Sequence, residues 1–135
     1  MSLLIDDLLS WWAGQASLNA GEDLFAGLAP ESGELVSTVR QTGGPVRTFE
    51  PTMTATFQVT TRAETLAAAM GRADALYDAL YPSGRDRLPW RNVELSDGWR
   101  MLAVDALQPP GDLGVGDDGR RRVVFNITVR AAKTA

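Results

Sequence analysis

The side chains of this protein that could do chemistry are few and of limited types. The 135 residues include no cysteine and no histidine. The first absence removes disulfides and thiolate metal sites, and the second removes the commonest metal ligand and the usual acid–base group near neutral pH. Catalysis would therefore depend on carboxylates, lysine or hydroxyls, and no spaced set of these resembles a nucleophile–base pair.

Two pairs of carboxylates could in principle act together. Asp6 and Asp7 are adjacent on a predicted helix and so point in different directions. Asp74 and Asp78 are one turn apart on another predicted helix, on its solvated flank. We interpret the second pair as surface charge, and we regard an enzyme that uses converging carboxylates as the least favoured hypothesis.

Three further aspartates, Asp112, Asp117 and Asp118, lie in a glycine-rich stretch that could suggest a calcium site. The EF-hand spacing and its closing glutamate are absent, so a solvated acidic turn is the better interpretation. The sequence thus predicts no catalytic residue, no metal site and no cofactor.

Two other motifs have a functional and a plain interpretation. Thr42-Gly43-Gly44-Pro45 predicts a turn, and it lacks both the GK[ST] residues and the following helix of a phosphate-binding loop. The three consecutive arginines at 120–122 have no aromatic partners and are a weak sign of nucleic-acid binding. We expect them to pair with the acids of the preceding loop or with an acidic neighbouring protein.

The clearest structural pattern is a strand followed by a helix. Over residues 52–60, Met53, Ala55, Phe57 and Val59 alternate with threonine and glutamine, which predicts a strand with one buried face. Apolar residues then recur at helical spacing: Leu66, Ala69, Met70, Ala73, Leu76, Tyr77 and Leu80.

This helix has recognisable ends in the sequence. We expect Thr61 or Arg62 near its N-cap and Glu64 in its first turn, with Pro82 and Gly84 ending it. Because strand and helix each have one apolar face, the helix should lie across the sheet.

The other segments complete the expected fold. The first is a helix over residues 2–13 that is capped by Ser2, and we assign its Trp11 and Trp12 to the core rather than to a neighbouring subunit. Strands are expected over residues 34–41, 88–95 (at an edge of the sheet), 99–108 and 121–130. We expect a loop over 25–30, a mobile loop over 109–119 and a frayed tail over 131–135. The sequence therefore predicts an α+β fold. We expect a mostly antiparallel β-sheet of four to five strands with two main helices packed on it, as a single domain over residues 1–135.

Composition narrows the class of protein further. The formal charge is −4 and the pI about 4.7, which argues against DNA binding by phosphate neutralisation. The N-terminal apolar stretch is interrupted by Asp6 and Asp7 and has no basic residue before it, so it predicts neither a signal peptide nor a membrane span. What remains is a protein whose function is contact with other proteins.

Several segments form a pattern through their order along the chain. They are an apolar N-terminal helix, LFAGLAP, the TGGP motif, FQVTTRAET, AETLAAAMGRADALYDALY and ALQPPGDLGVGDDGRRRVVFNITV. Over roughly residues 24–129 this order resembles the tail-terminator or minor capsid proteins of tailed bacteriophages, also described as head–tail joining or tail-completion proteins. The resemblance implies a hexameric ring that caps the head-proximal end of a tail tube, ends tube polymerisation and joins the tail to the head connector. It also implies a virion protein assembled in the host cytoplasm, with the tube and connector proteins as partners, no membrane, and DNA only passing through the lumen.

Contacts with other subunits are expected in two loops and one cluster. The residues are Thr42, Gly43, Gly44 and Pro45 of the TGGP motif; Pro109, Pro110, Asp112, Asp117 and Asp118 of the loop over residues 109–119; and Arg120, Arg121 and Arg122, which we place at a subunit or tube interface. A plainer alternative is that both loops only connect strands. Other neck or tail-tube subunits, and a small cytoplasmic binding module, remain competing interpretations that differ in their state of assembly.

Overall fold

The computed structural model describes residues 4–19, 21–27, 35–47, 52–80, 91–96 and 99–133. Within these ranges it has two helices and six strands. In chain order they are α1 (Leu4–Gln15), β1 (Leu24–Ala26), β2 (Leu35–Arg47), β3 (Thr52–Ala63), α2 (Leu66–Asp78), β4 (Arg91–Ser96), β5 (Trp99–Val115) and β6 (Arg121–Lys133).

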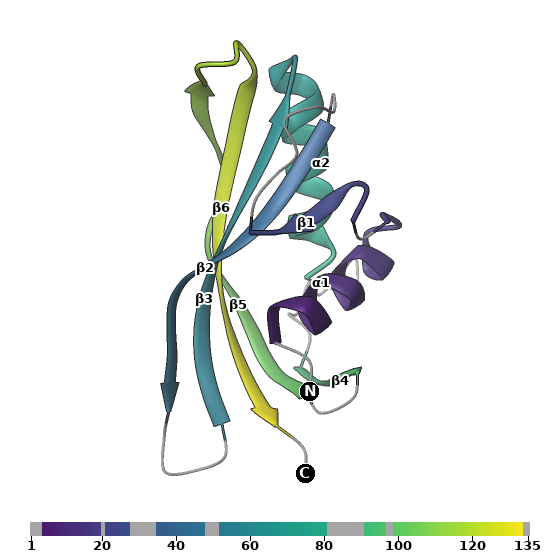
Figure 1. Ribbon diagram of the computed structural model, residues 1–135, viewed down its shortest axis with the longest axis vertical. Coiled ribbons are helices and arrows are strands. Elements are labelled where there is room, and N and C mark those ends of the chain that lie inside the picture. The colour runs from purple at the N-terminus through teal and green to yellow at the C-terminus, as the bar shows by residue number, and fades with distance from the viewer. Residues whose placement is uncertain are drawn as a thin grey trace.

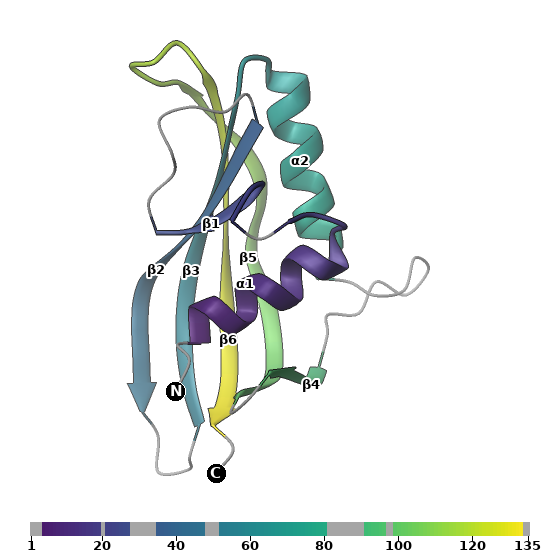
Figure 2. The same cartoon turned by 45° about the vertical axis from the view of Figure 1, so that its right-hand side comes forward.

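The six strands form one sheet in the order β1-β2-β3-β6-β5-β4. All neighbours are antiparallel except β1 and β2, which are parallel. The expectation of a mostly antiparallel sheet of four to five strands is therefore wrong, because the sheet is mixed and has six strands. The missed strand is β1, whose three residues are too few to show an alternating pattern. Both helices lie on one side of the sheet (Figures 1 and 2), which agrees with the predicted α+β layering.

The centre of the sheet is the regular pair β3–β6. All twelve residues of β3 have successive partners on β6 with no register shift. Ala55, Phe57 and Val59 of β3 are buried on the helix side, as the alternation predicted. Their neighbours on β6 continue the same apolar face: Val123, Phe125, Ile127, Val129 and Ala131. The predicted strands are confirmed here, although β3 and β6 are both longer than expected.

Helix α2 begins later than the sequence indicated. Its N-cap is Thr65, whose hydroxyl accepts a hydrogen bond from the backbone N–H of Ala68 at 3.2 Å. Thr61 and Arg62 are still in β3, because the alternation of buried residues continues to Ala63. The predicted apolar stripe is confirmed, since its buried members face the sheet: Ala69, Ala73, Leu76 and Leu80.

Helix α1 is anchored through Trp12, which is fully buried. Its indole N–H donates to the carbonyl of Leu76 at 2.8 Å, and its ring meets Phe125 edge-on with centroids 6.0 Å apart. Tyr77 meets the same phenylalanine edge-on at 5.6 Å. The assignment of Trp12 to the core is thus confirmed, and one aromatic cluster joins both helices to β6.

Other expectations concern the chain ends and the β4 region. The edge position of β4 is confirmed, but the strand spans Arg91–Ser96 and the preceding residues 88–90 lie outside the described residues. Ser2, Pro82 and Gly84 also lie outside them. The frayed tail predicted at 131–135 is wrong for its first part, because β6 pairs through Lys133 and Ala131 is buried.

Candidate assembly surfaces

The residues expected to form a loop at 109–119 mostly belong to a long hairpin. Strand β5 continues to Val115, and only a tight turn separates it from β6. The backbone N–H of Gly116 donates to the carbonyl of Arg120 at 2.9 Å, and Gly119 has φ +77°. We call residues 111–124 the β5–β6 arm. In Figures 1 and 2 its tip lies at the top of the molecule.

Prolines do not end β5 because the strand accommodates them in a bulge. Gln108 pairs with Asn126 and Gly111 pairs with Val124, so Pro109 and Pro110 lie where the register shifts. Proline has no N–H to donate, and such positions in a sheet are limited to edges and bulges. The loop prediction was wrong because it treated Pro and Gly as strand ends.

Two of the three consecutive arginines pair with acids of the same hairpin. The guanidinium of Arg121 lies 3.0 Å from the carboxylate of Asp112, and that of Arg122 lies 3.1 Å from Asp118. This confirms the expected pairing with the preceding acids. Arg120 contributes its backbone N–H, which donates to Asp118 at 3.0 Å.

The carboxylate of Asp118 is the most strongly perturbed acid of this arm. The hydrogen bond from the Arg122 side chain, and next the backbone N–H of Arg120, lower the pKa of Asp118 to about 2 from 3.8. Asp118 is exposed to solvent, so this pairing orders the tip of the hairpin more than it stabilises the fold. Asp117, also exposed, lies in the turn itself.

The TGGP motif is not a turn either. Thr42, Gly43, Gly44 and Pro45 are inside β2, where the register with β3 shifts on both sides of Gly43. The hydroxyl of Thr42 donates to the carbonyl of Thr56 at 3.3 Å. Gly43 does not take positive φ, so the glycines mark bulges in a strand rather than a chain reversal.

The two groups of predicted contact residues are not brought together within one chain. The TGGP motif is on β2, and β3 lies between β2 and the nearer strand of the β5–β6 arm, β6. Figures 1 and 2 show them toward opposite ends of the long axis. A contact between them would therefore have to involve two copies.

Sequence reasoning missed three exposed apolar residues on β5. Leu107, Leu113 and Val115 are large hydrophobic residues that stay 58%, 61% and 59% exposed. The sequence signal that could have revealed them is the occurrence of large apolar residues in a stretch otherwise made of Pro, Gly, Asp and Gln, because a solvated loop does not need such residues. All three lie on one strand, which makes them candidates for contact with another subunit.

The long strands β2 and β5, each next to a short outermost strand, also have edges that no described strand pairs with. Among the described residues, β1 pairs with β2 only at Ser37–Val39, and β4 pairs with β5 only from Trp99 to Ala103. We call residues 40–47 the β2 edge and residues 104–115 the β5 edge. Over these two ranges no described strand lies on the outer side, so backbone groups are presented for pairing.

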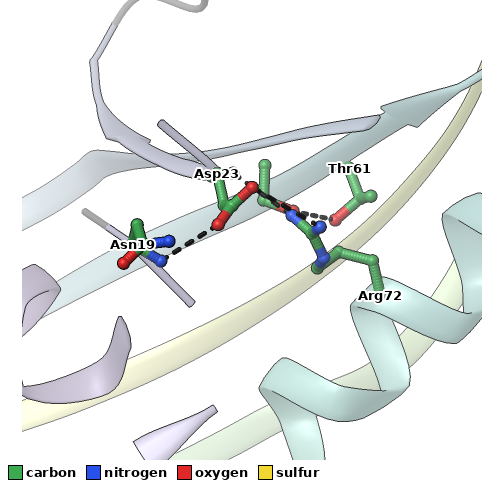
Figure 3. A network of polar contacts seen from close by, with 5 residues as sticks. Asn19, Asp23, Thr61 and Arg72 are labelled. Carbon is green, nitrogen blue, oxygen red and sulfur yellow. Dashed lines mark hydrogen bonds and ion pairs between the residues drawn. The ribbon is translucent and has the colours of Figure 1, made fainter. Parts of the chain in front are cut away.

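A polar network on the helix side fixes β1 to α2 (Figure 3). Arg72 donates to the backbone carbonyl of Asp23 at 3.3 Å and lies 3.9 Å from its carboxylate, which also accepts from the N–H of Asn19 at 3.0 Å. Ser37 and Thr61 share a buried hydrogen bond of 2.8 Å beside it. Burial lowers the pKa of Arg72, and the charge of Asp23 opposes this. We interpret the network as structural, because its groups are satisfied by one another.

Neither a metal site nor a membrane segment is seen in the part of the chain that the structure describes. There, no group of three or more acidic side chains is arranged to hold a metal ion. No helix among the same residues is both long and apolar enough to cross a membrane. Asp74 and Asp78, the helical acid pair, are both exposed, as expected for surface charge.

The fold has a counterpart among solved structures. A chain from the virion of a native gene transfer agent (GTA) particle superposes with a TM-score of 0.66. The match covers 99% of this chain and 100% of that chain, at 15% sequence identity. At this identity the likeness shows a shared fold. No protein-family model matches the chain, and no curated protein matches it.

Proposed function

We propose that this protein is a structural component of a phage virion that forms a ring at the head-proximal end of the tail tube. The observation that carries the proposal is the end-to-end likeness of fold to a chain of a virion particle. The order of sequence motifs that resembles the tail-terminator family supports the same role independently. A shared fold alone does not assign a function, so the proposal depends on both.

In this role the ring ends tube polymerisation and presents a surface to the head connector. Its partners are copies of itself, expected to number six, the tail-tube protein and the connector or neck protein. The chain is assembled in the host cytoplasm and resides in the virion. DNA passes through the lumen without specific binding, which is compatible with the formal charge of −4.

The proposal assigns no catalytic activity and no cofactor. It draws on the chemistry of the chain, which has no cysteine or histidine, and on Asp112 and Asp118, which are paired with Arg121 and Arg122. The contact residues proposed earlier in the TGGP motif and in the β5–β6 arm are assigned to assembly.

The decisive experiment is the mass of the purified protein by light scattering at several concentrations, with negative-stain images of any large species. Rings of fixed diameter and six-subunit mass would support a terminator. Open-ended tubes would favour a tail-tube subunit, and a monomer that leaves the ends of tail tubes uncapped would favour a binding module. A monomer that caps one end of added tubes would support a terminator that needs the tube as a template.

A further inference from the structure

We infer that neighbouring copies of this chain join head to tail, with the β5 edge of one copy beside the β2 edge of the next. The inference rests on the proposed function in that it requires several copies in one assembly. It does not depend on whether that assembly is a terminator ring or a tube.

In the described part of the chain, the strand pairing shows why these two edges have no partner strand. The short strands β1 and β4 cover only the first part of β2 and of β5, up to Val39 and Ala103. What remains is eight residues on one side of the sheet, 40–47, and twelve on the other, 104–115. An unpaired edge of this length invites a partner strand.

Strand direction makes these two edges compatible. Because β2, β3, β6 and β5 are successively antiparallel, β2 and β5 run in opposite directions. Copies placed side by side in the same orientation would therefore pair antiparallel. The edges lie on opposite sides of the sheet and toward opposite ends (Figure 2), so the contact joins different surfaces on the two partners. Such contacts close into a ring when the strands tilt relative to the ring axis, as staggered strands do in closed barrels.

The edges carry opposite charge. Among the side chains that the structure describes, the β2 edge has the base Arg40, and the β5 edge has the acid Asp105 beside Asp112, which is already paired with Arg121. Arg40 pairs in register with Gln58 and Asp105 with Thr128, both positions on the sheet face that the helices leave uncovered. Arg40 and Asp105 are both exposed. Charge complementarity of this kind selects the partner and its orientation.

The apolar residues give such a contact its driving force. Leu107 and Leu113 are more than half exposed, and burying each against a second copy would remove that surface from water. Pro109 and Pro110 in the same edge cannot donate hydrogen bonds, so backbone pairing there is interrupted. The prolines discourage pairing with arbitrary strands, which leaves recognition to the side chains.

A charge-swap experiment tests the contact between copies. We would prepare Asp105→Arg and Arg40→Glu separately, mix them in equal amounts, and measure mass by light scattering beside the wild type. Each variant alone should assemble only at concentrations on the order of tenfold higher than the wild type, or not at all. The mixture should regain assembly, because alternating copies place an arginine opposite an acid at every contact.

A matched control distinguishes an effect of charge at the proposed contact from a general effect of the changed net charge. Asp74→Arg makes the same change at an exposed site on α2 and should assemble like the wild type. Circular dichroism should show all variants folded. Wild-type oligomers that persist unchanged in both single variants would overturn the inference while leaving the proposed function intact. Open filaments sensitive to the swap would support the inference and overturn the terminator role. If the wild type is a monomer that caps added tail tubes, the same variants are compared for capping, and capping that is unchanged in both single variants would overturn the edge contact.

Discussion

In the centre of the sheet, β3 and β6 pair through twelve successive residues without a shift, whereas β5 pairs with β6 through four register shifts. The centre is covered by both helices and buries its apolar face. The β5–β6 arm instead holds its tip with exposed ion pairs and leaves Leu113 and Val115 open to solvent. Strand β6 thus contributes to the buried core along its pairing with β3, and its first residues belong to the exposed β5–β6 arm.

The largest effect should come from breaking the centre. Phe125→Ala removes the ring that Trp12 and Tyr77 both meet edge-on, and the buried cavity should cost about 3–5 kcal/mol in the free energy of unfolding. Urea denaturation measures this. The neighbouring Val124→Ala, on the uncovered face and partly exposed, should cost less than about 1 kcal/mol. Equal losses at both positions would contradict the contrast between the two faces.

The polar network of Figure 3 should contribute less than the aromatic cluster. Asp23→Ala removes the acceptor of Asn19 and the partner charge of Arg72, and should lower the free energy of unfolding by about 1–3 kcal/mol. A double-mutant cycle with Arg72→Met should show that the two losses are not additive. Strict additivity would mean that the ion pair contributes nothing.

Two glycines sharpen the comparison at the level of the backbone. Gly119→Ala in the turn of the arm forces a side chain into φ +77° and should cost about 1–2 kcal/mol. Gly43→Ala in β2 should leave stability unchanged or raise it by up to about 1 kcal/mol, since an added Cβ would lie an ordinary 3.6 Å from Thr56. Thermal denaturation of both variants distinguishes the turn glycine from the bulge glycine, and the reverse order would refute the assignment.

The smallest effect on stability concerns the pH response of the arm tip. Because the folded pKa of Asp118 is depressed, its pairing is complete above the ordinary value of 3.8 and is lost as pH falls toward 2. Arg122→Gln should raise the pKa of Asp118 back toward 3.8, measured by NMR titration of its carboxyl carbon. Arg120→Gln is the control, because Arg120 acts on Asp118 through its backbone N–H. An equal rise in both variants would exclude the side-chain pair as the main cause.

The sequence predicted the secondary structure correctly in the regions where the apolar pattern is regular. The clean alternation in β3 and β6 and the stripe of α2 identified their buried faces, because side-chain direction there follows a fixed period. The same reasoning failed for β5 and for the TGGP motif. In both, proline and glycine lie in bulges, and whether a strand continues past a bulge is decided by its neighbour strand.

For a related reason, the sequence predicted some contacts of the candidate surfaces and missed others. The pairing of Arg121 and Arg122 with nearby acids followed from short sequence separation. Asp23 and Arg72 are 49 residues apart, and no local pattern connects them. The exposed residues of β5 became recognisable only when their strand was known, since exposure of Leu107 depends on which edge is left unpaired.

The position of β6 in the sheet has a consequence for how the protein is made. It pairs with both β3 and β5 at the middle of the sheet, yet it follows every other strand in the chain. While the ribosome is still adding residues 121–133, β3 and β5 lack the strand that separates them, and their apolar faces stay open. The sheet therefore closes only after these residues leave the exit tunnel, and a nascent chain stopped earlier offers exposed edges to chaperones and proteases.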